Sequence, residues 1–296
     1  MTNPFFKNKG PFKVNKLLKL AGIKHSEFIS NKTVNDIKDL DQASKYDITF
    51  LNSVKYIDIA NKTKSHIIIT NNKCKSLIKN KCTLVVVDNV FATPILQKPL
   101  NYGADVVMYS ATKHFDGHGR VLGGAILGSH SFCENIIKPF IRNTGPSISP
   151  FNAWVLLKGI ETLELRIKQQ TKSAKEIISF LEKNKNIKKI YYPTLKKSKQ
   201  IKIAKQQMLD GGTIIAFEIK ASKKNEKKKS FEFLNKLKLI DISNNLGDSK
   251  TLITHPYTTT HHKLEQKEKM SLRITENLIR LSVGLENPTD LIDDLD

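Results

Sequence analysis

The feature that most constrains the fold is a pair of apolar, β-branched runs near the middle of the chain. They occupy residues 83–87 and 104–108, and a short helix-like segment that ends at Gly103 lies between them. Two strands joined by a helical crossover form a βαβ unit, whose strands are parallel. The pattern therefore predicts an α/β fold.

Polar side chains follow both runs at the point where each strand is expected to end. Asp88 and Asn89 come directly after the first run, and Ser110, Thr112 and Lys113 follow the second. In an open α/β sheet the carboxyl ends of neighbouring strands face one crevice, where ligands bind. We therefore expect these side chains to converge on a cofactor.

An acid, two hydroxyls and a lysine match the chemical needs of pyridoxal 5'-phosphate (PLP). Its aldehyde needs an amine to form a Schiff base, its ring nitrogen needs an anion, and its phosphate needs hydroxyl donors. Lys113, Asp88 and the pair Ser110 and Thr112 fill these roles in that order. A single lysine or aspartate is more often a solvated side chain or a turn cap. The four together favour a cofactor site with Lys113 as its catalytic residue.

The same stretch resembles a known family. The sequence VVVDNVFATPILQKPLNYGADVV, followed by SATKH and DGHGRVLGG, is similar to the lysine segment of the Cys/Met-metabolism enzymes that use PLP. The similarity extends over about residues 83–296. Within the family, GHGRVLGG, GPSISPFNAWVLLKGIETLELR and ISNNLGDSKTLITHPYTTTH are most similar to the O-succinylhomoserine sulfhydrylase branch. The resemblance implies a partial fold type I large domain over residues 83–182 and an α+β C-terminal domain over residues 183–296.

The resemblance also implies an activity and two substrate-binding residues. Arg280, in LIRLSVGLE, matches the family arginine whose planar, bidentate guanidinium binds the substrate α-carboxylate. Asn245, in SNNLGD, stands where many relatives have a serine near that carboxylate. The implied reaction replaces the succinate of an activated homoserine with sulfide and gives homocysteine for methionine biosynthesis. The implied partners are the amino-acid substrate, a sulfur donor and further copies of the chain in a homotetramer.

The C-terminal part has its own pattern of helices and strands. Ser149 and Pro150 predict the start of one long helix whose apolar positions continue to Leu181. Beyond it, the sequence predicts a helix over residues 231–239 and strands over residues 189–192, 213–219, 252–254 and 279–283. This succession is typical of an α+β domain with a mainly antiparallel sheet.

Residues 1–82 predict a small α/β module, with a helix over residues 14–21 and strands over residues 48–51 and 66–70. The opening PFF, the LLKLAGI helix and DITFLNSVKYIDIANKTKSHIIIT resemble the N-terminal uridine-binding domain of the UDP-3-O-acylglucosamine N-acyltransferase family. This resemblance implies nucleotide contacts by Phe50, Asn52 and Tyr56. The hexapeptide repeats that carry acyl transfer in that family are absent from the sequence, so we do not predict acyl transfer.

Composition bears on several other classes of protein. The net charge of +21 would favour nucleic acid, but the lysines are spread along the chain, with one cluster within residues 223–229 and no interleaved aromatics. We therefore expect no specific nucleic-acid partner. His114 and His118 lack a third ligand, which predicts no metal site. No apolar run approaches the roughly 20 residues that span a bilayer, and the start has no signal-peptide core, so we expect a cytoplasmic protein.

Three hypotheses from different classes follow. The first is a PLP enzyme that makes homocysteine. The second is an inactive hybrid, because residues 1–82 contain no glycine-rich phosphate loop and no aromatic suited to stack on the cofactor ring. The third is a uridine-nucleotide binding module with a degenerate tail, which predicts nucleotide binding that is lost on Phe50→Ala.

Overall fold

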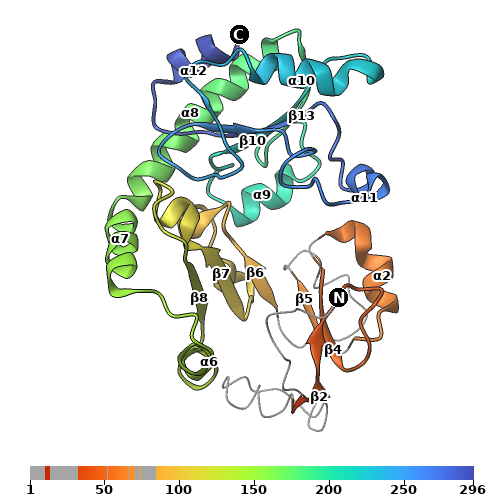
Figure 1. The fold of residues 1–296 in the computed structure, drawn as a ribbon, viewed down its shortest axis with the longest axis vertical. Coiled ribbons are helices and arrows are strands. Elements are labelled where there is room, and N and C mark those ends of the chain that lie inside the picture. Colours follow the sequence, from red (N-terminus) through yellow and green to blue (C-terminus); the bar gives the residue numbers. More distant parts are fainter. Residues whose placement is uncertain (1–10, 14–32, 52, 66, 71–73, 75–84) are drawn as a thin grey trace. The chain divides into compact units, whose positions relative to one another are not determined.

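The computed structural model describes residues 11–13, 33–51, 53–65, 67–70, 74 and 85–296 (Figure 1). Its mixture of helices and strands confirms the predicted α/β class. The chain forms two compact units. Unit 1 comprises Met1–Asn89, Pro99–Tyr109 and Ala125–Ile148, and unit 2 comprises Val90–Lys98, Ser110–Gly124 and Ser149–Asp296. The predicted domain boundaries after residues 82 and 182 stay a prediction.

Three small sheets lie mainly in unit 1. Their orders are β1-β2, β3-β4-β5 and β6-β7-β8. The first pair is antiparallel, whereas neighbours in the second sheet are parallel. The strands are β1 (Phe12–Lys13), β2 (Thr33–Val34), β3 (Asp36–Ile37), β4 (Asp47–Leu51), β5 (Ile67–Thr70), β6 (Val86–Asp88), β7 (Val106–Ser110) and β8 (Gly124–Gly128).

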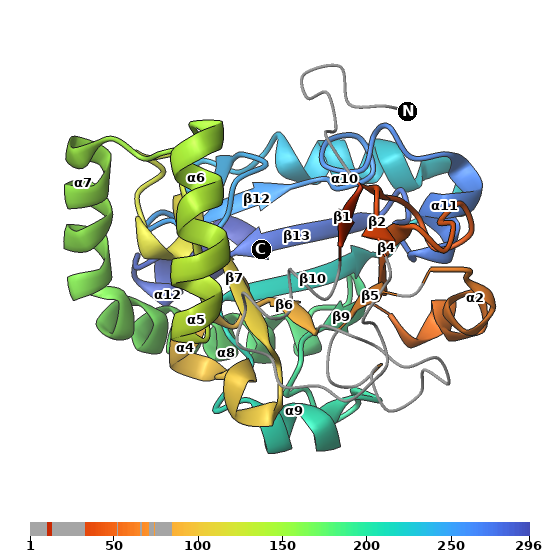
Figure 2. The ribbon, with the colours of Figure 1, turned by 90° about the horizontal axis from the view of Figure 1, so that it is seen from below.

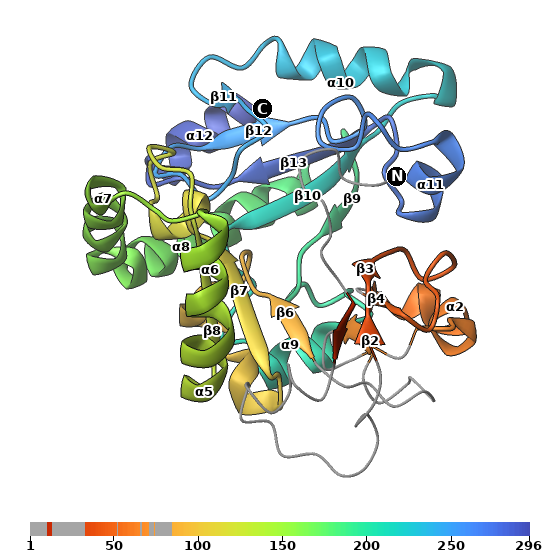
Figure 3. The ribbon, with the colours of Figure 1, turned by 60° about the horizontal axis from the view of Figure 1, so that its bottom comes forward.

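The strands predicted over residues 48–51 and 66–70 are confirmed as β4 and β5, and the helix predicted over residues 14–21 lies outside the described residues. α2 follows β4 and lies beside it (Figure 3). Leu51, Ala60, Ile68 and Cys74 form a buried cluster between these elements. The described helices of unit 1 are η1 (Val54–Tyr56), α2 (Ile57–Lys62), η2 (Pro99–Tyr102), α5 (His130–Phe132), η4 (Cys133–Ile137) and α6 (Lys138–Thr144).

The predicted βαβ unit is confirmed. β6 and β7 are parallel neighbours, with Val86 opposite Val106 and Asp88 opposite Met108. In the chain, α4 (Thr93–Leu96) and η2 connect the two strands. Gly103 ends this crossover with a φ of 84°, a left-handed conformation that glycine adopts without steric cost. Asp88 is thus the last residue of β6, and Lys113 follows the end of β7.

A five-stranded sheet forms the centre of unit 2, in the order β11-β12-β13-β10-β9 (Figure 2). β11 and β12 are parallel, and every other neighbouring pair is antiparallel. The prediction of a mainly antiparallel sheet is therefore confirmed. Its strands are β9 (Ile187–Tyr191), β10 (Ile214–Ile219), β11 (Asp241–Ile242), β12 (Leu252–Thr254) and β13 (Leu278–Ser282).

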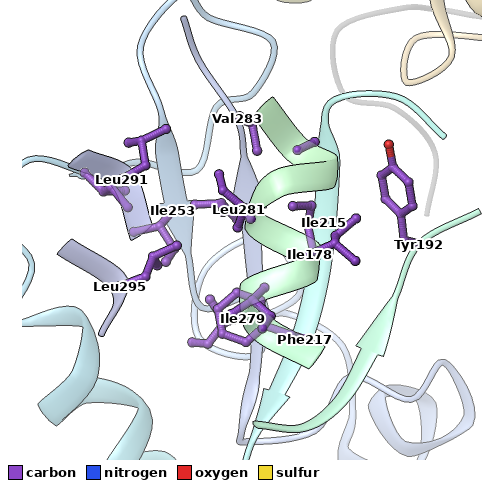
Figure 4. Packing of buried hydrophobic residues seen from close by; sticks show 14 of the residues in the cluster. Ile178, Tyr192, Ile215, Phe217, Ile253, Ile279, Leu281, Val283, Leu291 and Leu295 are labelled. Atoms are coloured by element: carbon purple, nitrogen blue, oxygen red, sulfur yellow. The ribbon is translucent and has the colours of Figure 1, made fainter. Parts of the chain in front are cut away.

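The hydrophobic core of unit 2 covers one face of this sheet. Ile279 pairs with Phe217 and Leu281 pairs with Ile215, so these buried side chains share that face, on which α8 and α12 pack (Figure 4). Successive side chains of a strand point to opposite faces. Arg280 therefore points away from the core. The helices of unit 2 are α4 (Thr93–Leu96), η3 (Ala111–Phe115), α7 (Pro150–Glu161), α8 (Leu163–Lys183), α9 (Ile201–Gln207), η5 (Lys223–Asn225), α10 (Glu226–Leu234), α11 (Gln266–Ser271) and α12 (Pro288–Leu295).

Two helix predictions need correction. Ser149 caps the predicted long helix by accepting from the Asn152 N–H, but the helix breaks at Thr162 into α7 and α8. The helix predicted over residues 231–239 is α10, which begins earlier, at Glu226, and ends at Leu234. The earlier start is explained by the lysines of the first turns, which are good helix formers. Lys228 and Lys229 also form ion pairs with Glu232 one turn later. Within the described part of the chain, none of the helices has the length and apolar character needed to cross a bilayer.

Candidate cofactor-binding site

Lys113 lies in a tight turn that directly follows β7. The turn, η3, is a single π-helical turn, and Lys113 itself has a non-helical backbone with φ −88° and ψ −123°. The turn is closed at both ends by backbone hydrogen bonds. Ala111 N–H donates to the Gly123 carbonyl at 2.8 Å, and Gly117 N–H donates to the Lys113 carbonyl at 2.8 Å.

The Lys113 amine is half-buried and has a defined partner. Its Nζ donates to Oδ1 of Asn245. Burial, and then the nearby Arg280 guanidinium, lower the pKa of the Lys113 amine below its ordinary value. Both effects disfavour the charged form. The neutral amine, which is the nucleophilic form, is therefore more accessible here than on a surface lysine.

Arg280 binds the loop that contains Asn245, the partner of Lys113. Its Nη2 donates to the backbone carbonyls of Asn244 at 2.8 Å and Asn245 at 3.1 Å. The two predicted substrate-binding residues, Asn245 and Arg280, are thus brought together with Lys113 within unit 2. Their predicted contacts with a substrate stay a prediction.

The two hydroxyl residues lie at the start of the lysine turn. The Thr112 hydroxyl accepts a hydrogen bond from the Gly123 N–H at 3.1 Å, so its own proton remains available to donate to another group. Ser110 begins the turn, and its side chain makes no capping hydrogen bond to it. Both hydroxyls are therefore suited to an oxyanion such as phosphate. Their assignment to the cofactor phosphate stays a prediction.

The imidazole of His114 is fully buried beside the site. Its Nδ1 lies 3.1 Å from the Val90 carbonyl, and its Nε2 lies 2.8 Å from the Thr213 hydroxyl. Because a carbonyl only accepts, Nδ1 carries the proton and Nε2 accepts from Thr213. Burial, and then the Arg166 charge, lower the pKa of His114 to about 4, so the ring is neutral at ordinary pH.

Asp88 and Asn89 belong to unit 1. Asn89 N–H donates to the Met108 carbonyl at 3.1 Å, and the Asn89 amide donates to the Tyr109 hydroxyl at 3.0 Å. These bonds tie the end of β6 to β7. Asp88 is exposed at that end. Its predicted pairing with a ring nitrogen stays a prediction.

The three predicted nucleotide contacts also fall in unit 1. Phe50 is exposed on β4, and Tyr56, the last residue of η1, packs in part against the Leu51 cluster. Asn52 lies outside the described residues. The predicted uridine site stays a prediction. Among the described residues, no group of three or more His, Cys, Asp or Glu side chains is arranged to hold a metal ion.

The profile of the Cys/Met metabolism PLP-dependent enzyme family matches residues 16–296. The chain belongs to this family. The match confirms PLP as the family cofactor predicted from the sequence. It begins at residue 16 and so extends further towards the N-terminus than the predicted resemblance over residues 83–296. The resemblance of residues 1–82 to the acyltransferase domain stays a prediction.

Named relatives include enzymes with several activities. O-succinylhomoserine sulfhydrylase of Mycobacterium tuberculosis is 48% identical over 212 residues, which are 72% of this chain and 52% of that protein. L-methionine gamma-lyase of Fusobacterium nucleatum is 41% identical over 218 residues, which are 73% of this chain and 54% of that protein. The chain spans about half the length of these curated relatives.

The fold is also similar to solved structures. Cystathionine gamma-lyase from Lactobacillus plantarum, solved in complex with L-serine, superposes with a TM-score of 0.72 and is 29% identical. The superposition covers 86% of this chain and 64% of that one. This likeness supports the general fold predicted from the sequence.

The residues of unit 2 fit the chemistry of PLP. A lysine with a lowered pKa can hold the cofactor aldehyde, and the neighbouring Ser110 and Thr112 hydroxyls can hold an oxyanion. Sequence reasoning missed one residue of this region, Arg166, which contacts the lysine turn from α8. The available signal was its position in the predicted long helix, on the same face as the apolar residues Leu163 and Ala174, which are buried in the structure.

Proposed function

We propose that the chain is a transsulfuration enzyme of the O-succinylhomoserine sulfhydrylase type. It exchanges the succinate of O-succinylhomoserine for sulfide and releases homocysteine. The observation that supports this most directly is the convergence of Lys113, Asn245 and Arg280, because a reactive amine and a carboxylate-binding guanidinium are joined there through one asparagine. The identity to the sulfhydrylase from Mycobacterium tuberculosis favours this activity over others of the family.

Bound PLP would supply an aldehyde that condenses with amines and a ring that withdraws electrons from the substrate. Lys113 would hold that aldehyde before the substrate arrives and move protons afterwards. Its lowered pKa suits it for both tasks, because the neutral Nζ can accept a proton from the substrate carbon and return it at a later step. Asn245 would keep Nζ in position through its Oδ1.

Arg280 would bind the substrate α-carboxylate. Only its Nη2 is engaged with the 244–245 backbone by the bonds described, and a guanidinium has five N–H donors. A carboxylate bound by Arg280 would lie near Lys113, because both residues bind Asn245, Lys113 at its side chain and Arg280 at its carbonyl. Proton transfer at the neighbouring carbon would then be local.

The first experiment is the visible absorption spectrum of the purified chain with added PLP, beside a Lys113→Ala control. We expect a band of lysine-bound cofactor in the parent and none in the variant. That result would justify an assay for homocysteine and succinate from O-succinylhomoserine and sulfide. If neither protein shows a band, the chain keeps the lysine without a working pocket, as the inactive-hybrid hypothesis predicts.

A second activity, elimination from methionine, is favoured by the identity to L-methionine gamma-lyases. The two activities differ in what they consume. Incubation with methionine alone should give methanethiol if the chain is a lyase, whereas the sulfhydrylase activity requires both O-succinylhomoserine and sulfide. The uridine-binding hypothesis is tested separately, by titration of the chain with a uridine nucleotide and with Phe50→Ala as the control.

A further inference from the structure

A buried arginine lies at the junction between α7 and α8. Arg166 is in the first turn of α8, yet it is only 4% exposed. It shares its helix face with Leu163 and Ile167, which are also buried. Arginines are almost never fully buried unless their donors are satisfied, so this position indicates a specific set of partners.

Those partners are oxygen atoms from two separate elements. From the lysine turn, the His114 carbonyl accepts from Nη1 at 2.9 Å. From the end of α7, the Gly159 carbonyl accepts from Nη2 at 2.7 Å and the Thr162 hydroxyl accepts from Nε at 3.1 Å. The Phe115 carbonyl lies 3.5 Å from Nη2. The guanidinium thus joins the backbone that follows Lys113 to the α7–α8 junction.

Two glycines make this close approach feasible. A Cβ at Gly159 would lie 2.2 Å from the Phe115 carbonyl oxygen, and a Cβ at Gly117 would lie 2.2 Å from Arg166 Nη1. Both distances are far inside van der Waals contact, so only glycine fits. Within the described residues Arg166 has no direct ion pair, although the carboxylates of Asp116 and Asp248 are near enough to favour its charge. Its shortest hydrogen bonds go to the backbone carbonyls of His114 and Gly159. These hydrogen bonds fix the backbone that follows Lys113, and a fixed backbone keeps a reactive side chain in one position.

We propose that Arg166 is a positioning residue that holds the Lys113 turn in the conformation in which Nζ meets Asn245. This inference rests on the proposed role of Lys113. The planar guanidinium can donate to the His114 and Gly159 carbonyls at the same time, because its donors lie in a rigid fork. A lysine ammonium at the same position is a compact point charge and cannot span both carbonyls. Loss of the fork frees the backbone after Lys113 and lets the amine move into solvent.

The test measures the ionisation of Lys113 itself. The full chain, without cofactor or substrate, is labelled with acetic anhydride over a series of pH values, and the Lys113 peptide is quantified by mass spectrometry against peptides of exposed lysines. In the parent we expect half-labelling at a lower pH than for the exposed lysines. In Arg166→Gln the half-labelling pH of Lys113 should rise towards that of the exposed lysines.

Arg166→Lys and Ile177→Ala are the companion variants. Arg166→Lys retains the charge without the fork and should give an intermediate shift. It also serves as the test if Arg166→Gln does not fold. Ile177→Ala removes a fully buried side chain from the same helix, away from the lysine turn, and so controls for loss of stability alone.

An unchanged Lys113 titration in the Arg166 variants would overturn the proposal, as would an equal shift in Ile177→Ala. Because the readout needs no turnover, it stands even if the proposed enzymatic activity is absent. Conversely, a shift confined to the Arg166 variants would support positioning whichever reaction of the family the chain performs.

Discussion

The two units differ in how they use their strands. Unit 2 places five strands in one sheet, against which a core cluster of sixteen buried residues packs among those described. The strands of unit 1 form separate sheets of two or three, and the cluster at β4 and β5 has four buried residues among those described. Small sheets are marginal on their own. Lys113, Asn245 and Arg280 thus lie in the unit with the larger core cluster among the described residues, which is the better support for a precise site.

The largest expected effect is a core truncation in unit 2. Phe217 is fully buried in the centre of the sheet, whereas Leu51 lies in the small cluster of unit 1. We expect Phe217→Ala to lower the free energy of unfolding by about 4 kcal/mol and Leu51→Ala by about 2 kcal/mol, because a small cluster collapses more readily around the missing atoms. Urea denaturation, followed by hydrogen exchange of peptides from each unit, measures both.

Matched controls are the exposed residues Phe151 in unit 2 and Ile59 in unit 1. Phe151→Ala and Ile59→Ala should change the free energy of unfolding by less than about 1 kcal/mol. Two results would contradict the expected difference between the units. One is an equal loss in the free energy of unfolding for Leu51→Ala and Phe217→Ala, and the other is an equal loss of exchange protection in both units for either variant.

The second prediction concerns the pH dependence of unit 2. The pKa of His114 is about 4 in the folded chain, below its ordinary value of 6.5. Between these values the unfolded chain binds a proton that the folded chain does not, so stability falls as the pH drops from 6.5 towards 4. The loss attributable to His114 should reach about 3 kcal/mol at pH 4. Denaturation midpoints at a series of pH values measure this slope.

His114→Gln should flatten that slope, because glutamine does not titrate. His118→Gln is the matched control, since His118 is four residues away and exposed. The pKa of His255 is also lowered by burial, so part of the slope should persist in His114→Gln. An identical slope in the parent and in His114→Gln would mean that the His114 ring is protonated, or hydrated, in the folded chain.

Local pattern was enough to predict much of the fold. The β-branched runs before Asp88 and Ser110 are parallel strands in the structure, because their period and the crossover between them leave few alternatives. Ser149 caps its helix as predicted, because serine is favoured at the N-cap and proline at the first helical position. The apolar run over residues 279–283 also predicted a strand, which the structure forms as β13.

Other features depend on contacts that a local pattern does not contain. The break at Thr162 lies where Gly159 meets the Phe115 carbonyl, a contact between residues far apart in the sequence. The bond from Lys113 to Asn245 spans 132 residues, and only the family resemblance suggested that the two side chains share a site. The helix face of Arg166 could be predicted from the sequence, but its partners could not, because they are backbone carbonyls of other elements.

The smallest expected effect compares one carboxylate in each unit. Burial tends to raise the pKa of Asp47 in unit 1, but hydrogen bonds from Ser44 and Lys38 outweigh it and lower that pKa. Burial likewise tends to raise the pKa of Asp294 in unit 2, where hydrogen bonds from three consecutive backbone N–H groups outweigh it. Each folded pKa lies below 3.8, so the stabilisation is fully present above that pH and is lost as the pH falls through the folded value.

We expect Asp47→Asn to cost about 2 kcal/mol at pH 7 and Asp294→Asn about 1 kcal/mol, because Asp47 is the more deeply buried acceptor. The exposed neighbours Asp41 and Asp293 provide the control substitutions to asparagine. Urea denaturation at pH 7 and pH 3 measures both costs, which should shrink at the lower pH as the parent carboxylates become protonated. A larger cost for Asp294→Asn than for Asp47→Asn would show that polar contacts, as well as the core, stabilise unit 2 more than unit 1. The two units would then differ in overall stability and not only in the size of their cores.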